Sequence, residues 1–246
     1  MRGRDLCWEG CLNVRDLGGL ETEDGAETRF GSVIRADTLG LLTAAGWRAL
    51  AAAGVARIVD LREPFELEND LPRELDVEVV RVPVFDRLDE TMWEEIRRAS
   101  ESAVSHAAAT EAVYLRFLDH CRTRFVDAVA AVATAPGVVV VHCHGGKDRT
   151  GLVAAMLLRL ALVPVDAVAE DYAYSAVRLQ PRHDEWFADA ADDAERARLE
   201  RLAATPREAM EAVLEALDRR YGGVEGYLLD GGLAADDLAA ARARLR

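Results

Sequence analysis

The strongest constraint on the fold is a strand-like run, a glycine-rich loop and an apolar segment that follow one another without interruption. The run is Val138–Val141, and Pro136-Gly137 precedes it. The loop reads HCHGGKDRTG over 142–151, and the apolar segment continues from Leu152 to Val163. A β-branched run bounded by breakers predicts a buried strand, and an apolar stretch without a polar face predicts a helix buried on most sides. The sequence therefore predicts a strand that passes through a tight loop directly into a buried helix.

The segments before this loop predict the rest of a sheet. Val55–Leu61 and Val77–Phe85 are short runs rich in β-branched residues. Thr43 is the predicted N-cap of a helix over 44–53, which Gly54 ends. Strand-like runs separated by helical stretches are typical of parallel sheets. We therefore expect an α/β fold with a central, mostly parallel sheet flanked by helices. We expect the site at the carboxyl end of the strand 138–142.

The rest of the chain is helical by its spacing of apolar residues. Helical periodicity runs from Arg87 to about Thr134, and 113–132 is expected to be one continuous helical stretch. The charged segment 192–201 predicts a solvated helix face with ion pairs between residues four apart. The first 35 residues predict short strands and turns. Because the chain contains no repeat and no low-complexity linker, we expect a single domain over 1–246.

Composition excludes several classes of protein. The formal net charge is −14, with 30 basic and 44 acidic residues, which argues against nucleic acid or an anionic membrane as the main partner. No window of about 18 apolar residues predicts a membrane span, and the N-terminus lacks the apolar stretch of a signal peptide. The four cysteines are too few for a disulfide scaffold. We expect the protein to be located in the reducing cytoplasm, and secretion without a visible signal peptide is the alternative.

The 142–151 loop has the composition of an oxyanion site. The first N–H groups of a helix have no intrahelical partner and carry partial positive charge. Gly145 and Gly146 allow successive amides to point inward around an anion. Arg149 then comes round to the anion that Cys143 faces, and its guanidinium binds two oxygens at once. We therefore expect phosphate or another oxyanion in this loop.

Cys143 is expected to be a reactive thiolate. A free thiol has a pKa of about 8.5, and backbone amides, a helix dipole and nearby cations lower it to about 4–6. Thr150 is expected to add a hydroxyl hydrogen bond to the sulfur. A thiolate at the base of an oxyanion cradle attacks phosphorus, and water then hydrolyses the cysteinyl-phosphate.

Three other interpretations of the loop are weaker. A nucleotide-binding P-loop requires Gly where Val141 stands and Ser or Thr where Asp148 stands. Metal ligation by His142-Cys143-His144 is disfavoured because adjacent strand residues point to opposite faces. A structural buried cysteine leaves the charges at the helix start unexplained, including Lys147, the one lysine beside 29 arginines among the 30 basic residues. We expect no metal and no organic cofactor.

The loop resembles the HCxxGKDRTG signature of bacterial tyrosine phosphatases of the cysteine-dependent superfamily, whose loop has the form CX5R. The resemblance implies a cysteine-phosphatase-like α/β fold and hydrolysis of phosphate monoesters. It implies that Cys143 is the nucleophile and that Arg149 binds the phosphoryl group. Further landmarks similar to that family occur across most of the chain, at Asn13–Gly19, Arg35–Asp37, Val59–Arg62, Asp171-Tyr172, Ser175 and Tyr221–Leu228.

The resemblance leaves the general acid open. Asp86 follows the predicted strand 77–85, which is similar to the placement of the general acid in dual-specificity phosphatases. Residues 87–122 would then form a helical, lid-like insertion near the site mouth.

Two further aspartates compete for the same role. Asp148 lies inside the loop, where Lys147 and Arg149 lower its pKa while a bound phosphate dianion raises it. Asp60 ends a strand and is expected to pair with the arginine of the VDLR motif. We weigh Asp86 and Asp148 equally and place Asp60 behind both.

The substrate class is also open. His144 and Lys147 occupy loop positions that are basic in phosphoinositide phosphatases of the tensin type, which favours a highly anionic substrate. The acidic remainder of the chain lacks a polybasic membrane face. We order phosphotyrosine proteins first and dual-specificity or phosphoinositide phosphatase activity second. A non-catalytic phosphate-binding or redox-sensing role comes last, because both Cys143 and Arg149 are present.

Several residues outside the loop allow a structural or a functional interpretation. Asn13, Arg15 and Asp16 either brace the loop or form a hydrogen-bonded turn, and we favour the turn. Asp171 and Tyr172 are expected to be structural. Cys7 and Cys11 would face each other on a helical turn, where we favour packing over a redox partnership with Cys143.

Overall fold

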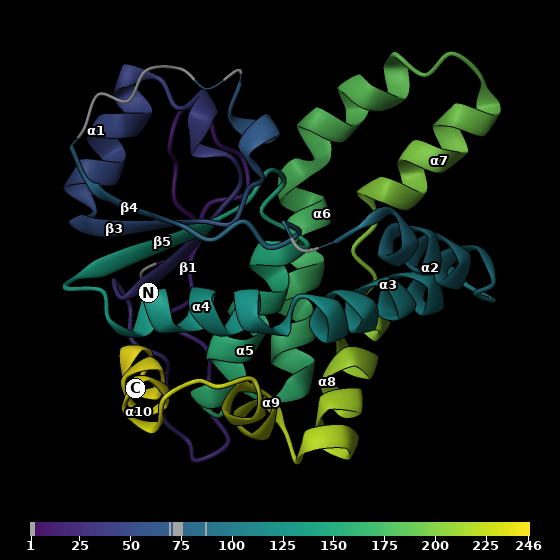
Figure 1. The fold of residues 1–246 in the computed structure, drawn as a ribbon. Helices are drawn as coiled ribbons and strands as arrows, with labels where there is room; N and C mark the ends of the chain where they lie inside the picture. The colour runs from purple at the N-terminus through teal and green to yellow at the C-terminus, as the bar shows by residue number, and fades with distance from the viewer. Residues whose placement is uncertain (1–2, 69, 71–75, 87) are drawn as a thin grey trace.

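The fold is built on a twisted sheet, seen in a computed structural model that describes residues 3–68, 70, 76–86 and 88–246 (Figure 1). Within that part of the chain the strand order is β1-β2-β5-β3-β4. β2, β5, β3 and β4 run parallel, and β1 pairs antiparallel with β2. The mostly parallel sheet predicted from the sequence is confirmed. The strands are β1 (Arg15–Asp16), β2 (Val33–Ala36), β3 (Val55–Asp60), β4 (Glu78–Arg81) and β5 (Val138–His142).

β5 lies in the middle of the sheet and sets the position of the loop that follows it. His142, its last residue, pairs with Ala36 at the end of β2 and with Asp60 at the end of β3. Three parallel strands therefore finish at one level. The segments that follow them lie around the same carboxyl edge, which is where ligands bind in open α/β sheets.

Helices cover both faces of the sheet. Figure 1 shows α1 over one face and α4, α5 and α10 over the other. The helices are α1 (Ala44–Ala52), α2 (Glu90–Glu101), α3 (His106–His120), α4 (Arg122–Ala133), α5 (Arg149–Leu160), α6 (Val165–Ala188), α7 (Asp193–Ala203), α8 (Arg207–Tyr221), α9 (Val224–Asp230) and α10 (Ala235–Arg244), with 3₁₀ helices η1 (Leu39–Leu41) and η2 (Pro64–Leu67).

Alternation along β5 divides the core into two hydrophobic clusters. Val139 and Val141 belong to the cluster that contains α4 and α5, whereas Val140 belongs to the cluster on the α1 side with Trp47. Successive strand residues point to opposite faces, so a run of valines satisfies both sides at once. Burial on both faces explains why β5 is continuously apolar.

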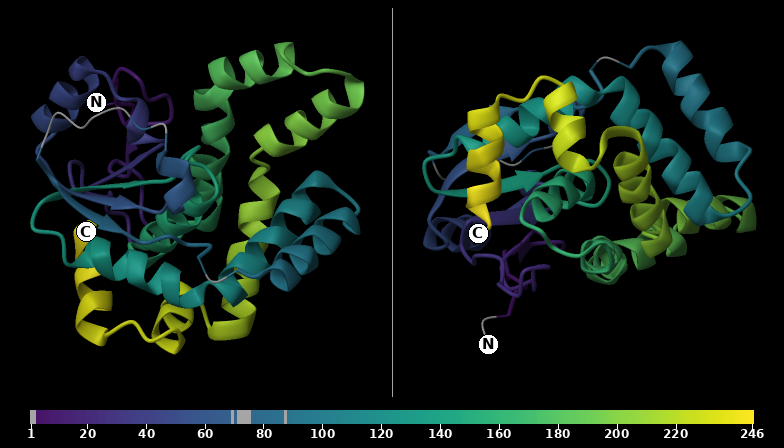
Figure 2. Two further views of the ribbon diagram at one scale, coloured as in Figure 1. Left: turned by 45° about the horizontal axis from the view of Figure 1, so that its top comes forward. Right: turned by 90° about the horizontal axis from the view of Figure 1, so that it is seen from below.

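Two helical pairs extend beyond the sheet (Figure 1 and Figure 2). α6 and α7 form a hairpin that projects from the body of the molecule. α2 packs on α3, and α3 packs on α8, far away in the sequence. α7 carries the predicted ion pair between residues four apart, Arg196 to Glu200, at 3.2 Å. Among the helices that the structure describes, none is long and apolar enough to cross a membrane.

The structure corrects three predicted boundaries. The strand predicted over 77–85 covers only Glu78–Arg81, because Arg81 pairs with Asp60, the last residue of its neighbour β3. The buried helix begins at Arg149 rather than Leu152, so α5 starts inside the loop, and it ends at Leu160 rather than Val163. The helical stretch predicted over 113–132 is interrupted at Cys121, which separates α3 from α4.

In the N-terminal part of the chain, one local prediction is confirmed and another is wrong. Thr43 is the N-cap of α1, and its hydroxyl accepts a hydrogen bond from the Gly46 N–H at 3.3 Å. The helical turn expected around Cys7 and Cys11 is absent from this described segment, which forms a bridge and turns instead. Cys11 is buried and donates to the Thr38 carbonyl at 3.1 Å, whereas Cys7 is exposed.

Candidate active site

The β5–α5 loop, residues Cys143–Asp148, leads from the central strand into the first turn of α5. That turn reads Arg-Thr-Gly-Leu from Arg149, and its N–H groups carry the partial positive charge of a helix N-terminus. Cys143 directly follows His142, the last residue of β5, and is 2% exposed. The loop therefore has the geometry of an anion site with a buried thiol at its base.

The two loop glycines are not equivalent. Gly146 has a φ of +66°, and a Cβ atom there would lie 2.4 Å from the Ala36 carbonyl oxygen. At Gly145 the nearest atom to such a Cβ would be Lys147 Cγ, at 3.7 Å. Gly146 is therefore required by both backbone conformation and space, whereas Gly145 has room for a side chain.

Asn13 and Arg35 hold the loop from outside. The Asn13 side-chain amide donates to the carbonyl oxygens of Gly145 and Gly146, at 3.1 and 3.2 Å. Arg35 Nη2 donates to the Gly146 carbonyl at 2.7 Å. Arg15 donates in turn to the Asn13 side-chain oxygen. The bracing hypothesis is thus confirmed for Asn13 and, through it, for Arg15, and the hydrogen-bonded turn that we favoured is wrong for these two residues.

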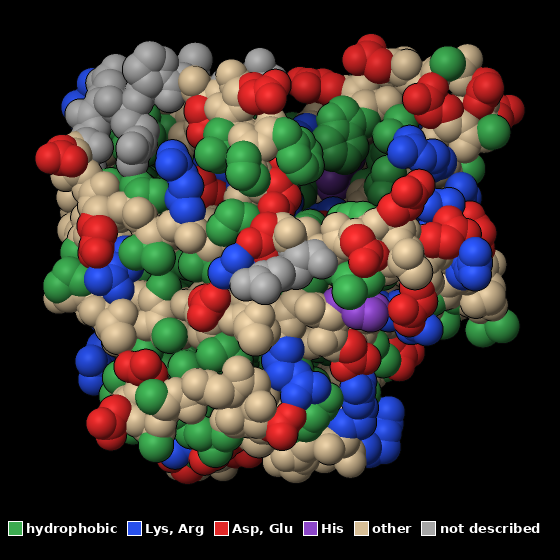
Figure 3. All heavy atoms as spheres, viewed as in Figure 1, with side chains coloured by type: hydrophobic (Ala, Val, Ile, Leu, Met, Phe, Trp, Pro, Cys, Tyr) green, Lys and Arg blue, Asp and Glu red, His purple; other side chains and the backbone are tan. Residues whose placement is uncertain are grey.

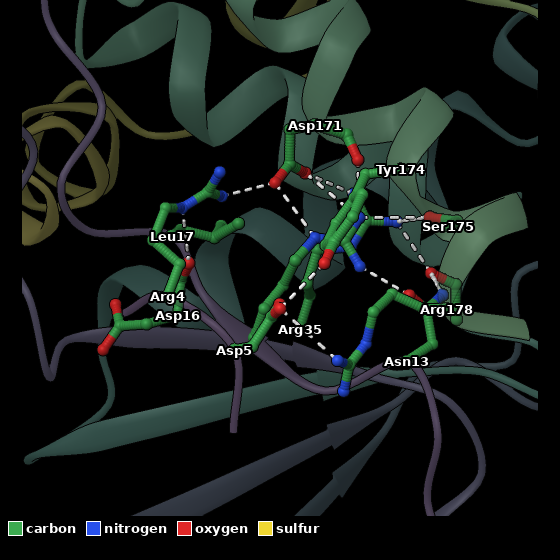
Figure 4. A network of polar contacts seen from close by, with 12 residues as sticks. Arg4, Asp5, Asn13, Asp16, Leu17, Arg35, Asp171, Tyr174, Ser175 and Arg178 are labelled. Atoms are coloured by element: carbon green, nitrogen blue, oxygen red, sulfur yellow. Dashed lines mark hydrogen bonds and ion pairs between the residues drawn. The ribbon is translucent and has the colours of Figure 1, made fainter. Parts of the chain in front are cut away.

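Asp171 on α6 gathers these arginines in a buried network (Figure 4). Its carboxylate accepts from Arg15 Nε at 3.0 Å, from Arg35 Nη1 at 2.6 Å and from Arg4. Burial raises the pKa of Asp171, but the three guanidinium groups outweigh it and hold the pKa far below the ordinary value. Ser175 accepts from both Arg15 and Arg35. The structural role expected for Asp171 is confirmed, and it reaches the loop through Arg35.

Asp16 does not take part in this bracing. Its two carboxylate oxygens accept from the N–H groups of Gly18 and Gly31, at 2.8 and 2.7 Å. The hydrogen-bonded turn is therefore the correct reading for this residue.

Glu66 is a site residue that the sequence did not single out. Its carboxylate accepts from Arg149 Nη1 at 2.6 Å and from Nη2 at 2.7 Å, in a bidentate pair. Arg149 Nη1 also donates to the Leu61 carbonyl at 3.3 Å, and the guanidinium lies 4.9 Å from the Phe85 ring centroid. Burial lowers the pKa of Arg149, but Glu66 and the electrostatic interaction with Cys143 raise it above its ordinary value.

A local sequence signal for Glu66 exists in retrospect. Glu63 and Glu66 form a capping box around η2, with Pro64 at the helix start. Glu66 accepts from the Glu63 N–H at 2.8 Å, while Glu63 accepts from the Phe85 N–H at 2.7 Å. Burial raises the pKa of Glu63 above its ordinary value. The spacing Glu-Pro-X-Glu indicates a helix start, but it does not indicate that Arg149 is the partner.

Asp148 is held at the outer end of the loop. Its Oδ1 accepts from the Tyr114 hydroxyl at 2.6 Å and from Lys147 Nζ at 3.0 Å. The Tyr114 and Tyr172 hydroxyls lie 2.8 Å apart, so Tyr172 donates to Tyr114. Burial raises the pKa of Asp148, but Lys147, Tyr114 and Arg149 together bring it below its ordinary value. A tyrosine from α3 thus orients this carboxyl group.

The other two candidate aspartates have arginine partners. Asp86 Oδ1 accepts from Arg124 Nε at 2.9 Å. Asp60 accepts from Arg62 Nε and Nη2, at 3.0 and 2.9 Å, which confirms the expected pairing within VDLR. His142 Nε2 lies 3.5 Å from Asp60 Oδ1, and burial lowers the pKa of His142.

The remaining predicted residues lie on the loop and in the first turn of α5. Thr150 is buried, and its hydroxyl has no hydrogen-bond partner among the described residues, so the hydrogen bond predicted from Thr150 to the Cys143 sulfur is not formed in this structure. The pKa of His144 lies below its ordinary value, because partial desolvation and neighbouring arginines outweigh the opposing charge of Glu66. The structure thus brings the predicted loop residues together, with Asp86 on the segment after β4.

The surface is hollowed beside the α6–α7 hairpin, at the carboxyl end of the parallel strands (Figure 3). Hydrophobic side chains rim this hollow, and a histidine side chain is visible at its floor. Acidic and basic side chains are interspersed over the surrounding surface.

Comparison with known proteins places this site in a family. The model of the tyrosine phosphatase family matches residues 6–246. A tyrosine-protein phosphatase of Nostoc commune is 32% identical over 222 residues, which are 86% of this chain and 73% of that protein. The triple specificity protein phosphatase PtpB of Mycobacterium tuberculosis is 26% identical over 260 residues, 92% of this chain and 93% of that protein. The chain therefore belongs to the tyrosine phosphatase family of enzymes.

Proposed function

We propose that the protein is a protein tyrosine phosphatase in which Cys143 is the nucleophile and Arg149 binds the phosphoryl group. The Cys143 thiolate attacks phosphorus, the bond from phosphorus to the ester oxygen breaks, and that oxygen takes up a proton. A water molecule then attacks the cysteinyl-phosphate, releases inorganic phosphate and restores the thiolate. No metal enters either step.

The donor geometry of Arg149 carries this proposal. A guanidinium has five N–H donors. Glu66 takes one from Nη1 and one from Nη2, and the Leu61 carbonyl takes the second one on Nη1. The Nε–H and the remaining Nη2–H lie along one edge of the plane, which is the fork that binds two phosphate oxygens. Glu66 therefore fixes the guanidinium and leaves its phosphate-binding edge to the substrate.

We propose Asp148 as the acid/base residue and keep Asp86 as the second candidate. Asp148 lies on the loop itself, and a bound phosphate dianion raises its pKa toward a protonated state. Asp86 lies outside the loop, on the segment after β4, and its carboxylate is paired with Arg124. Aryl phosphates with leaving groups of graded pKa test the choice. Without a general acid, the hydrolysis rate depends steeply on the pKa of the leaving group. We expect this steep dependence in Asp148→Asn and not in Asp86→Asn. The steep dependence in Asp86→Asn alone would reverse the assignment.

The substrate order follows the same site. We propose phosphotyrosine proteins first, because the matched family and its Nostoc relative carry that name. Phosphoserine and phosphoinositide substrates come second, supported by His144 and Lys147 on the loop and by the name of the mycobacterial relative. Phosphate release from a phosphotyrosine peptide, a phosphoserine peptide and phosphoinositides, with Cys143→Ser as control, tests the order. No release from any of them would refute the proposed function.

We also propose one domain over 1–246 in which α2 and α3 form the helical insertion near the site. Tyr114 on α3 supports this because it donates to Asp148, and Trp93 on α2 packs edge-on against Phe85 at 5.5 Å. Arg87, where the expected insertion begins, lies outside the described residues. We place the protein in the reducing cytoplasm, which keeps a catalytic thiolate reduced.

A further inference from the structure

A cavity adjoins the outer end of the β5–α5 loop. It has a volume of about 240 Å³ and lies between α3, α7 and the loop. The loop contributes Lys147 and Asp148, and α7 contributes Arg198 and Arg201. The cavity therefore shares two residues with the site already described.

The charge of this cavity is unusual for so acidic a protein. Lys147, Arg198 and Arg201 line it, together with one carboxylate, that of Asp148. Asp148 already accepts hydrogen bonds from Lys147 and Tyr114, so the positive charges of the two arginines are in excess. The first turns of α3, from His106 to Thr110, form another part of the wall. The positive end of that helix dipole adds to the potential of the side chains.

Arg198 and Arg201 differ from the other arginine of the same helix. Arg196 donates to Glu200 and pairs with it at 3.2 Å. Within the described part of the chain, neither Arg198 nor Arg201 forms an ion pair with a carboxylate, and the nearby Glu195 accepts from the Ala191 N–H instead. The two arginines are three residues apart, so like charges face each other on one side of α7, which destabilises an isolated helix. An anionic ligand between them removes that repulsion.

We propose that this cavity binds a second acidic group of the substrate, a carboxylate or phosphate side chain close to the phosphotyrosine in a protein segment. This deepens the proposed function and rests on it. Lys147 is four residues from Cys143 and so within about 15 Å of it along the loop. Side chains two residues apart in an extended peptide are about 7 Å apart, so an acidic residue two to four positions from the phosphotyrosine spans this separation. The acidic composition of the chain favours a peptide over an anionic membrane.

A peptide series tests the proposal directly. The reference peptide has one phosphotyrosine flanked by glutamines, and each other peptide replaces one glutamine by glutamate at positions from four before to four after. We expect wild-type kcat/KM to rise about three- to tenfold for the best-placed glutamate, because exposed charge pairs contribute modestly. The gain should shrink at high salt. It should disappear in the double variant Arg198→Gln/Arg201→Gln and persist in the matched control Arg196→Gln.

The outcomes separate this inference from the proposed function. Hydrolysis of the reference peptide by wild type but not by Cys143→Ser supports the phosphatase independently of the cavity. Equal kcat/KM for all peptides, or a gain that survives in the double variant, would overturn the second subsite. Hydrolysis of phosphoinositides in vesicles that exceeds every peptide and is lost in the double variant would overturn the assignment to a protein segment. Circular dichroism melts of all variants show whether they are folded.

Discussion

Replacement of Glu66 by glutamine separates the positioning of Arg149 from its charge. The two side chains are 9% and 13% exposed, so solvent screens their interaction little. Glutamine keeps one acceptor oxygen, so Glu66→Gln loses one of the two charge-assisted hydrogen bonds at 2.6 and 2.7 Å. Such a bond contributes about 1.5–3 kcal/mol. Since about 1.4 kcal/mol is a factor of ten in rate, we expect kcat/KM to fall about 10- to 100-fold.

The measurement compares two matched Arg–Glu pairs. Arg57 and Glu78 form a second bidentate pair, at 2.8 and 3.1 Å, on the surface between β3 and β4. Glu78→Gln is therefore the control for loss of an ion pair as such. Steady-state hydrolysis of an aryl phosphate and the inhibition constant of inorganic phosphate are measured for both variants. Equal effects of the two substitutions, or wild-type kcat/KM in Glu66→Gln, would refute the positioning of Arg149 by Glu66.

The ion pair between Glu66 and Arg149 also predicts how the stability of the protein changes in acid. Burial raises the pKa of Glu66, but the hydrogen bonds and charge of Arg149 outweigh it, so the pKa lies below its ordinary value of 4.5. A depressed carboxyl pKa stabilises the folded state above the unfolded value, and this contribution is lost as pH falls through the folded pKa. The melting temperature of wild type should therefore fall more steeply below about pH 4.5 than that of Glu66→Gln.

Three further predictions concern the loop and its supports. Gly146→Ala should lose activity and melt well below wild type, because its Cβ would lie 2.4 Å from a carbonyl oxygen, whereas Gly145→Ala should keep a wild-type melting temperature; equal melting of the two would contradict the requirement for glycine. Asp171→Asn should lower the free energy of unfolding by about 3–5 kcal/mol, because buried arginines lose their partner; chemical denaturation measures this, and a loss below 1 kcal/mol would contradict it. Tyr114→Phe removes a hydrogen bond that lowers the pKa of Asp148, so the titration of Asp148 in the kcat–pH profile should move to higher pH; an unshifted profile would show that Tyr114 does not orient this carboxyl.

The sequence predicts those parts of the site that are contiguous in the chain. The order of strand, loop and helix around Cys143 is local, because each element is specified by its own apolar pattern and by the glycines between them. The pairing of Asp60 with Arg62 is equally local. Even here the start of α5 is displaced by three residues, since the polar Arg149 and Thr150 do not look like the buried residues that they are.

The parts that the sequence does not predict are contacts between distant segments. Glu66 reaches Arg149 only because β3 and β5 are neighbours in the sheet, and no spacing within one segment encodes that order. Tyr114 reads as an apolar position of an amphipathic helix, and its hydroxyl contact with Asp148 depends on how α3 packs. The unpaired charges of Arg198 and Arg201 likewise look like a solvated helix face until the neighbouring helices are placed.

The central claim is that the phosphoryl group passes through a covalent bond to Cys143. Rapid acid quench during turnover of an aryl phosphate, followed by mass spectrometry of the peptide that contains Cys143, tests this claim most directly. We predict one phosphoryl group on Cys143, formed in the same burst as the released phenol. Phosphate release without a phosphorylated Cys143, and equal release by Cys143→Ser, would contradict it.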